Sequence, residues 1–355
     1  MTTPDVSVII PCHNAAVTLP LQLEALARQE NAPAFEVLVV DNRSGDDPAA
    51  AITAWQDRLP ALRIVPAADL PGAAYARNVG VAASSADHLL FCDADDLVAR
   101  DWVRAGHDAL QHVEIACGSD VVLTDEEFTT VDAVWADHLD ALPGGRVEVR
   151  TAAIDYPILL GGNVAIRRST FVAVGGFDAA LVSGNEDNDL AVRAERAGHL
   201  INRAPAMRAA LRERRGARAL FARSRVAARG HIELCDLHDL WTVSPHLRGH
   251  AWRLDIVRAG AASARMLIRP ASERDWRALA GRWGVAVGFW EGDLRRRIPR
   301  RPPPVPLIGA GLRSEQIEFT FAGTASDPDQ PGKPDTPDDA DKPDQVRPEY
   351  DNEDT

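Results

Sequence analysis

The chain has 355 residues, which allows one substantial core of about 200 to 250 residues and a smaller second unit. Its composition, 46% apolar and 26% charged, excludes a wholly disordered or membrane-embedded chain. Of the net charge of −13, −8 falls on residues 327–355, which leaves −5 for the remainder. Because a bulk positive field is absent, we expect no nucleic-acid partner.

The four cysteines are widely separated and form no CxxC pair, which is typical of a reducing compartment; they are Cys12, Cys92, Cys117 and Cys235. No export signal is recognisable at the N-terminus, and no apolar run approaches the roughly 18 residues of a membrane helix. We therefore expect a cytoplasmic protein, with any contact to the inner face of the cell membrane being peripheral.

In chain order, the first hundred residues alternate between short apolar runs and longer polar or helix-period stretches. The apolar runs predict strands at residues 6–10, 37–40, 62–65 and 89–92. Between them, Leu19, Leu23 and Leu26 share one helical face, and residues 73–83 form a small-residue helix after a Pro-Gly pair. This alternation predicts an α/β fold with a mostly parallel sheet flanked by helices.

From Phe171 the pattern changes to a helix start, a glycine pair, an acidic loop at 185–189 and a helix that ends at Gly198. Residues 203–229 then hold nine arginines and one acidic residue, and apolar positions at helical spacing continue to about Trp290. We divide the chain into a first domain at 1–210, a helical extension at 211–320 and a disordered acidic tail at 321–355.

Polar clusters follow three of the predicted strands, at the edge where ligands bind in open parallel sheets. They are Pro11-Cys12-His13-Asn14, Asp41-Asn42-Arg43-Ser44 and Asp93-Ala94-Asp95-Asp96. An Asp-x-Asp behind a buried strand suits Mg²⁺ or Mn²⁺ with diphosphate oxygens completing the shell. The alternative is that these acidic residues form turns and helix caps, with Asp96 the clearest candidate for a cap.

A collinear series of motifs over about residues 5–200 resembles family 2 glycosyltransferases. The motifs are Ser7-Val8-Ile9-Ile10-Pro11, Val39-Val40-Asp41-Asn42-x-Ser44, Ala76-Arg77-Asn78-x-Gly80, Asp93-Ala94-Asp95, Gly162-Asn163, Gly175-Gly176-Phe177-Asp178 and Glu186-Asp187-x-Asp189-Leu190. Each is common alone, and their shared order carries the resemblance. It implies the GT-A fold and inverting transfer of a sugar from a nucleoside-diphosphate donor to a hydroxyl acceptor.

The resemblance also implies roles at the donor site. Asp41 would accept from the base and Asp93 would contact the ribose, while Asp95, with Asp93, would hold Mn²⁺ or Mg²⁺. Pro11 lies in the first strand motif and is assigned to the nucleotide site. Asn14 either contacts the nucleotide or caps the following helix.

Two further groups of residues complete the expected site, one at the donor and one at the acceptor. Arg77 would belong to the donor site and order the carboxylates there; without the resemblance, a surface ion pair is an equal alternative. Glu186, Asp187 and Asp189 lie at a helix start, where close carboxylates raise one another's pKa. The resemblance assigns the base to Asp187, with Glu186 beside it and Asp189 as a brace. Alternatively, all three stabilise the helix N-terminus.

The acceptor is not identified by these motifs, although residues 131–157 are expected to form part of its site. A role in cell-surface glycan or polysaccharide synthesis follows from the resemblance. The alternative from another class is a non-catalytic sugar-nucleotide-binding or scaffold protein, against which the intact Asp95 and Asp187 argue.

In the extension, the arginines suit a solvated face, a diphosphate-facing lining or a contact with anionic lipid. Nearby Trp276, Trp283 and Trp290 fit a membrane contact or a core equally. The histidines at 231, 238 and 246 match no standard zinc spacing, and we expect them on helix surfaces.

Overall fold

The structure, a computed structural model, describes residues 3–59, 61–142, 144–182, 184–213, 216–250, 252–266, 268, 272–297 and 305–312. All of these residues belong to one compact unit. The acidic tail predicted at 321–355 lies outside the described residues. No helix in the described ranges combines the length and the apolar character needed to cross a membrane.

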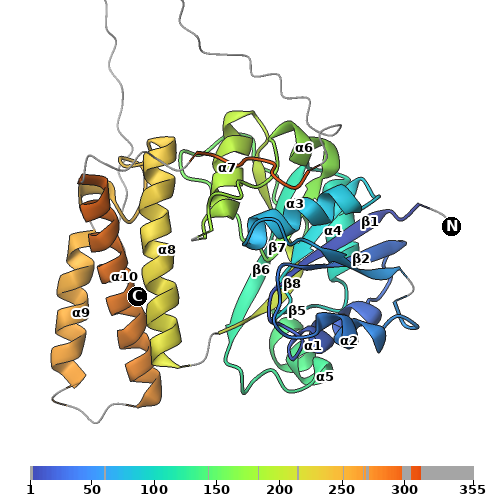
Figure 1. The fold of residues 1–355 in the computed structure, drawn as a ribbon, viewed down its shortest axis with the longest axis horizontal. Helices are drawn as coiled ribbons and strands as arrows, with labels where there is room; N and C mark the ends of the chain where they lie inside the picture. Colours follow the sequence, from blue (N-terminus) through green and yellow to red (C-terminus); the bar gives the residue numbers. More distant parts are fainter. Residues whose placement is uncertain are drawn as a thin grey trace, which may run out of the picture. The chain divides into compact units, whose positions relative to one another are not determined.

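The first part of the chain is a run of parallel strands joined by helices (Figure 1). Its elements are β1 (Val6–Cys12), α1 (Leu19–Ala27), β2 (Phe35–Asp41), α2 (Pro48–Thr53), β3 (Leu62–Pro66), α3 (Ala73–Ala83) and β4 (His88–Cys92). β1 pairs in parallel with both β2 and β4, and β2 pairs in parallel with β3. The four predicted strands and both predicted helices are therefore confirmed.

The second part completes an eight-stranded sheet in the order β3-β2-β1-β4-β7-β6-β8-β5. Its elements are β5 (Leu97–Val98), α4 (Trp102–Leu110), β6 (Ile115–Leu123), α5 (Val131–Val134), the π-helix η1 (Trp135–Leu139), β7 (Asn163–Arg167), α6 (Arg168–Ala173), α7 (Glu186–Arg196) and β8 (Ile201–Arg212). β7 runs antiparallel to β4 and β6. The predicted fold class is confirmed, and the antiparallel β7 is an addition that the sequence pattern did not indicate.

Both faces of the sheet are buried, which explains why its strands are almost continuously apolar. On one face, Val8 and Ile10 of β1 pack with Leu23 of α1. On the other, Ile9 packs with residues of α3. A Cβ at Gly80 would lie 2.5 Å from Ile9 Cγ2, so α3 crosses the sheet this closely only because it carries glycine there.

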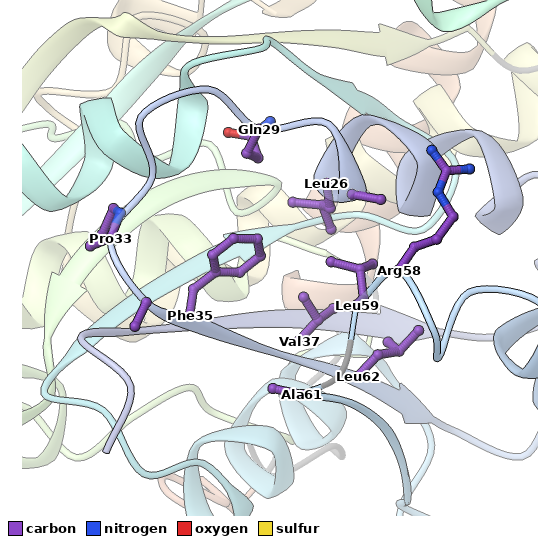
Figure 2. A pocket seen from close by; sticks show the side chains of 11 residues that line it. Leu26, Gln29, Pro33, Phe35, Val37, Arg58, Leu59, Ala61 and Leu62 are labelled. Atoms are coloured by element: carbon purple, nitrogen blue, oxygen red, sulfur yellow. The ribbon is translucent and has the colours of Figure 1, made fainter. Parts of the chain in front are cut away.

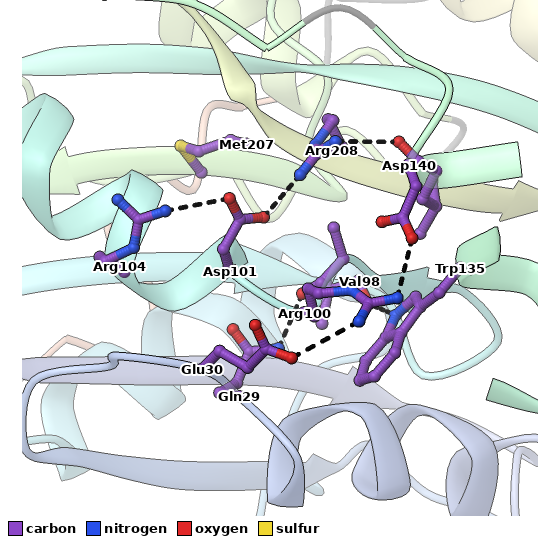
Figure 3. Close-up of polar contacts among 12 residues, drawn as sticks. Gln29, Glu30, Val98, Arg100, Asp101, Arg104, Trp135, Asp140, Met207 and Arg208 are labelled. Atoms are coloured by element: carbon purple, nitrogen blue, oxygen red, sulfur yellow. Dashed lines mark hydrogen bonds and ion pairs between the residues drawn. The ribbon is translucent and has the colours of Figure 1, made fainter. Parts of the chain in front are cut away.

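The segment that follows β4 is held by charged and polar side chains from several elements (Figure 3). Arg208 of β8 pairs with Asp101 at 2.8 Å, and Arg100 pairs with Asp140 at 2.8 Å. Trp135 donates its indole N–H to a carbonyl of β5 at 2.9 Å. These contacts anchor the chain just beyond the Asp-x-Asp loop and so restrict where that loop can lie.

A small hollow of about 250 Å³ opens beside the N-terminal end of β2 (Figure 2). It is lined largely by apolar side chains, among them Leu26, Phe35, Leu59 and Leu62. This is the end of the strand opposite to Asp41. Because ligands in such sheets bind beyond the carboxyl ends of the strands, the hollow is not the candidate site.

The helical extension is present and contains α8 (Ala217–His238), the short helix η2 (Arg248–His250), α9 (Trp252–Met266) and α10 (Glu273–Arg297). α8 and α10 pack at close range. A Cβ at Gly284 would lie 2.4 Å from the Phe221 carbonyl oxygen, and one at Gly288 would lie 2.3 Å from that of Arg225. Glycine at these positions lets the two helix backbones approach.

One interpretation of the arginine-rich segment 203–229 was that it begins the helical extension. Its first ten residues, 203–212, are instead in β8. β8 pairs in parallel with β6. Its small or apolar residues, such as Ala204 and Met207, are buried, while its arginines occupy more exposed positions. The strand does not alternate strictly, because its register against β6 shifts between Arg203 and Arg208, so the sequence shows no period of two.

The expectation of surface histidines in α8 was wrong for His231 and His238, which are both buried. His231 contacts Tyr156 Oη at 2.9 Å through Nδ1 and Ser244 Oγ at 2.8 Å through Nε2. Burial and the nearby His246 lower the pKa of His231 to about 4. These histidines are buried because α8 is covered on more than one side, which helix periodicity alone does not reveal.

Residues 305–312 follow the extension and return to the first domain. The Leu307 N–H donates to Asp178 Oδ1 at 2.8 Å, and Asn78 Nδ2 donates to the Ala310 carbonyl at 2.9 Å. Asn78 also donates to the Phe177 carbonyl at 2.9 Å. We call residues 305–312 the strap. Asn78, part of the Arg-Asn-x-Gly motif, thus holds the strap on the sheet domain together with Asp178.

Candidate active site

A cleft of about 930 Å³ opens beyond the carboxyl ends of β1, β2 and β4. Its lining includes six of the residues selected from sequence, namely Pro11, Asn14, Arg77, Asp93, Asp95 and Glu186. Asp41 and Asp187 do not line it but directly adjoin the lining residues Asn42 and Glu186. The fold therefore brings the separate sequence clusters to one place.

The loops after β1 and β2 are tied together at the cleft. Asn14 adopts a left-handed backbone with φ of 54°, and its Oδ1 accepts from the Gly45 N–H at 2.6 Å. The Asn14 N–H donates to Ser44 Oγ at 3.1 Å, and Asp41 Oδ1 accepts from the Ser44 N–H at 3.1 Å. Since α1 has Thr18 at its N-cap, Asn14 does not cap that helix.

Arg77 is buried and joins two carboxylates from distant parts of the chain. Nη1 donates to Glu186 Oε1 and Nη2 donates to Asp93 Oδ1, both at 2.8 Å. Burial lowers the pKa of the guanidinium, but the charges of Asp93, Glu186 and Asp187 outweigh burial and raise it above its ordinary value. Arg77 is 3% exposed, which excludes the surface ion pair considered as an alternative.

Asp187 has both carboxylate oxygens held by backbone groups. Oδ2 accepts from the Gly161 N–H at 3.0 Å, and Oδ1 accepts from the Asn188 N–H at 2.8 Å. Burial and then the charge of Glu186 raise the pKa of Asp187 to about 6, against the opposing effects of these N–H groups and of Arg77. A carboxylate with this pKa is suited to accept a proton near neutral pH.

The third carboxylate of this group, Asp189, is a brace between helices. Oδ2 accepts from Arg193 Nη2 at 2.6 Å, and Oδ1 contacts His238 Nε2 at 2.7 Å. Burial raises the pKa of Asp189, but the His238 hydrogen bond and the charge of Arg193 outweigh it, so the net shift is downward. This arrangement ties α7 to the C-terminal end of α8.

Two family models match parts of the chain. Residues 7–175 match Glycosyl transferase family 2, and residues 147–214 match the N-terminal domain of galactosyltransferase. Over residues 7–175, the chain is similar to glycosyltransferase family 2. The resemblance drawn from the sequence motifs is confirmed.

Among individual family members, the chain is 29% identical over 187 residues to glycosyltransferase AglE of Haloferax volcanii, covering 52% of this chain and 60% of the relative. It is 30% identical over 216 residues to validoxylamine A glucosyltransferase of Streptomyces hygroscopicus subsp. limoneus, covering 54% and 48%. The chain thus spans about half to three fifths of the length of these two relatives.

Solved glycosyltransferases share the fold. The mannosyltransferase PcManGT of Pyrobaculum calidifontis, in complex with GDP-Man and Mn²⁺, superposes with a TM-score of 0.55 at 18% identity, covering 84% of this chain and 89% of that one. S. aureus TarS in complex with UDP gives a TM-score of 0.50 at 15% identity, covering 86% and 99%. The GT-A fold of this chain is therefore shown.

The carboxylates near the Asp-x-Asp loop differ in their surroundings. Asp93 and Asp95 line the cleft. Asp96 is buried and accepts from the Arg212 N–H at 3.1 Å, so it joins β8 instead of capping a helix. Burial and the charges of Asp93 and Asp95 raise the pKa of Asp96.

The donor set suits a divalent cation. Asp93 and Asp95 line the same cleft and offer hard oxygen ligands. Mg²⁺ or Mn²⁺ commonly binds one or two carboxylates and completes its coordination shell with substrate phosphates. Among the described residues, no group of three or more His, Cys, Asp and Glu side chains could hold a metal by itself. These two carboxylates therefore fit a cation that takes its remaining ligands from outside the protein.

Two arginines of the cleft were not selected individually from the sequence, although a diphosphate-facing lining was one interpretation of their segment. Arg212 lines the cleft, and its guanidinium is already engaged there: Nε donates to the Asp95 carbonyl at 3.0 Å, Nη1 pairs with Asp125 at 2.5 Å, and the group lies 3.9 Å over the Phe128 ring. Arg223 of α8 reaches the same cleft and is exposed. The density of arginine in the segment concealed which of them face the site.

Glycine at 162 was read as a turn without a chemical role, and it lies against the carboxylates. A Cβ there would come within 2.9 Å of Asp93 Oδ2 and 3.3 Å of Asp96 Oδ2.

Asp120 of β6 is a further carboxylate that the sequence analysis missed. Burial raises its pKa to about 6, and Asn163 Nδ2 donates to it at 2.5 Å. No local motif distinguishes Asp120, because its place beside the site depends on sheet order.

Proposed function

We propose that this protein is an inverting, metal-dependent glycosyltransferase that moves a hexose from a nucleoside-diphosphate donor to a hydroxyl acceptor. The observation that carries this proposal is the double contact of Arg77. It joins Asp93, on the side of the cleft built by the donor motifs, to Glu186, the neighbour of Asp187. One buried guanidinium thereby couples the donor residues with the candidate base.

In the proposed step, Asp187 removes the proton of the acceptor hydroxyl as that oxygen attacks the anomeric carbon. The new bond joins the acceptor oxygen to the anomeric carbon, and the bond from that carbon to the diphosphate oxygen breaks on the opposite face. The proton remains on Asp187, and the electron pair leaves with the nucleoside diphosphate. The raised pKa of Asp187 supports this role.

Asp93 and Asp95 would hold Mn²⁺ or Mg²⁺, which when bound neutralises charge on the diphosphate. We assign Asp41, Pro11 and Asn14 to the nucleotide site. Glu186 would position Arg77 and lend negative charge beside Asp187.

We further propose that Arg223 approaches the diphosphate from the extension, because its side chain is exposed and lines the same cleft. A guanidinium beside departing phosphate favours the transition state, in which negative charge grows on the leaving group. Arg77 cannot do this while it is bonded to Asp93 and Glu186.

The proposed setting is the assembly of cell-surface glycan or polysaccharide in the cytoplasm. Two relatives support it by name, the amylovoran biosynthesis glycosyltransferase AmsB of Erwinia amylovora and the succinoglycan biosynthesis protein ExoO of Rhizobium meliloti. All four cysteines are unpaired and buried, as is usual in reducing compartments.

Calorimetric titration with UDP, GDP and TDP, each with Mn²⁺ and then with EDTA, tests the donor site without knowledge of the acceptor. We expect one nucleotide to bind in the presence of metal and to dissociate with EDTA, and Asp95→Ala to lose this dependence. Absence of binding by folded protein would overturn the proposal.

The same titration tests Arg223. We expect Arg223→Ala to weaken nucleotide binding roughly tenfold, the size of one charge-assisted hydrogen bond. Arg218→Ala is the matched control, since Arg218 is exposed on the same helix but does not line the cleft. Equal affinities for the two variants would remove Arg223 from the site.

A further inference from the structure

A second pocket, of about 580 Å³, lies within the helical extension and away from the residues of the cleft. It is formed by α8, α9, α10 and the loop before η2. Its charged lining consists of Arg258, Arg265 and Arg282 with a single carboxylate, Asp255, and His246 adds a fourth nitrogen-bearing side chain. A concave surface with this excess of guanidinium groups is suited to a phosphate-bearing ligand.

The arginines of this pocket are incompletely neutralised by the protein. Asp255 Oδ1 accepts from Arg258 Nη1 at 3.1 Å, which uses the only carboxylate of the lining. Arg265 donates to the Ala261 carbonyl of its own helix at 3.4 Å. Within the described part of the chain, neither Arg265 nor Arg282 forms a salt bridge, so both charges remain available to an anion.

An apolar stripe runs along α9 beside these arginines. Its members recur at spacings of three and four, which places them on one side of the helix; they are Leu254, Val257, Ala261 and Ala264. All four are exposed, with Leu254 54% and Val257 66% exposed. α10 packs against both α8 and α9, and Figure 1 shows α9 at the outer side of the extension. The stripe on α9 is exposed and so is not covered by other described residues.

We propose that this face of α9 docks on an anionic lipid bilayer, with a lipid phosphate seated in the pocket and the apolar stripe entering the headgroup region. Arg258 and Arg265 lie on the side of α9 next to the stripe, so apolar and cationic groups meet the surface together. An anionic bilayer complements both at once, whereas a soluble phosphate compound would leave the stripe exposed to water. This inference does not rest on the proposed transferase activity.

The test is flotation of the purified full chain with vesicles of phosphatidylcholine alone or with about a third phosphatidylglycerol. We expect roughly tenfold more binding to the anionic vesicles. Arg258→Ala and Arg282→Ala should each reduce that binding roughly fivefold. The pair Leu254→Ser and Val257→Ser, which removes apolar surface without adding charge, should reduce it roughly tenfold.

Arg146→Ala is the control for a general loss of positive charge, because Arg146 is exposed in the first domain and outside the pocket. Binding by Arg258→Ala or Arg282→Ala equal to that of Arg146→Ala would overturn the proposal. Equal binding of the native chain to both kinds of vesicle would overturn it too. Circular dichroism and metal-dependent nucleotide binding of each variant show whether the fold and the cleft are intact.

Two further measurements distinguish other occupants. Inorganic phosphate is titrated in the absence of vesicles; binding that depends on Arg282, without any flotation, would mean a soluble phosphate ligand and would overturn the lipid source. Light scattering gives the oligomeric state; a dimer that dissociates in the Leu254→Ser and Val257→Ser variant would mean that a second copy covers the stripe. A monomer that floats with anionic vesicles supports the proposal.

Discussion

Arg77 is the residue on which the geometry of the cleft depends most. Its two hydrogen bonds join carboxylates that lie 16 and 109 residues away in the sequence. The side chain is buried, while Asp93 is still 37% exposed. Replacing the guanidinium therefore leaves two unpaired carboxylates, Glu186 at 14% exposed and Asp93 at 37% exposed.

We expect Arg77→Ala to lower the free energy of unfolding by about 3 kcal/mol, the low end for breaking a buried ion pair, since Asp93 is partly exposed. Urea unfolding measures this change. Arg77→Lys should retain part of the stability but little activity, because an ammonium cannot bridge two carboxylates as a planar fork does. If Arg77→Ala lowered the free energy of unfolding by less than about 1 kcal/mol, the ion pairs of Arg77 with Asp93 and Glu186 would be as weak as surface ion pairs.

Asp187 makes a separate prediction about pH. Its pKa of about 6 means that the proton-accepting carboxylate predominates above pH 6, so kcat/KM should rise through pH 6 and level off near neutrality. Asp187→Asn should reduce turnover by roughly a thousandfold while nucleotide affinity is preserved. Unchanged turnover in this variant would mean that another group is the base.

The same pKa has a consequence for stability. A carboxyl whose pKa is raised on folding favours the folded state when protonated, and this contribution is lost as the pH rises through about 6. Asp187→Asn should therefore be at least as heat-stable as the native chain at pH 8, although it is inactive. A markedly lower melting temperature would show that the carboxylate's hydrogen bonds outweigh its desolvation.

At the scale of elements, the strap connects the end of the extension to α3 and to the turn at 177–179. Gly311 lies against α3 with φ of 99°, and a Cβ there would come within 2.9 Å of Val79 Cγ2 and 3.0 Å of Tyr75 Cε2. Both the backbone conformation and the space favour glycine. The strap also covers Asn78, the neighbour of Arg77.

Gly311→Val should displace the strap and lower the melting temperature by about 5 °C, which corresponds to a loss of roughly 2 kcal/mol in a chain of this size. Gly144→Val is the matched control, because a Cβ at Gly144 meets nothing within 4 Å. Scanning calorimetry compares the two. Equal melting temperatures would mean that the strap contributes no stability.

How far the sequence predicted these elements depends on how local their signals are. The strands at 6–10 and 37–40 and the helix at 73–83 were visible because apolar periodicity is a local property. β8 was missed since its register against β6 shifts and its buried residues do not alternate. The burial of His231 was missed since it depends on neighbouring helices. The donor cluster was predicted because the carboxyl ends of parallel strands converge.

At the scale of the whole molecule, α7 is joined to α8 through Asp189 and His238, and the strap provides a second connection. We expect the first domain and the extension to unfold in one calorimetric transition, with His238→Ala shifting it to lower temperature. Two separate transitions in the native chain would contradict this.

The link between α7 and α8 also depends on pH. Because the pKa of Asp189 is lowered on folding, its contribution to stability is present above about pH 4 and is lost on acidification below it.

The sequence by itself determined the fold class, the resemblance to family 2 glycosyltransferases and the carboxylates that follow the parallel strands, because apolar periodicity and short motifs are local properties. Only the tertiary structure decided which side chains face one another. In the structure, Arg77 bonds to both Asp93 and Glu186, Arg223 of α8 lines the cleft, and the strap contacts Asn78. Those contacts depend on how helices and strands pack across long separations, and no local pattern of residues specifies them.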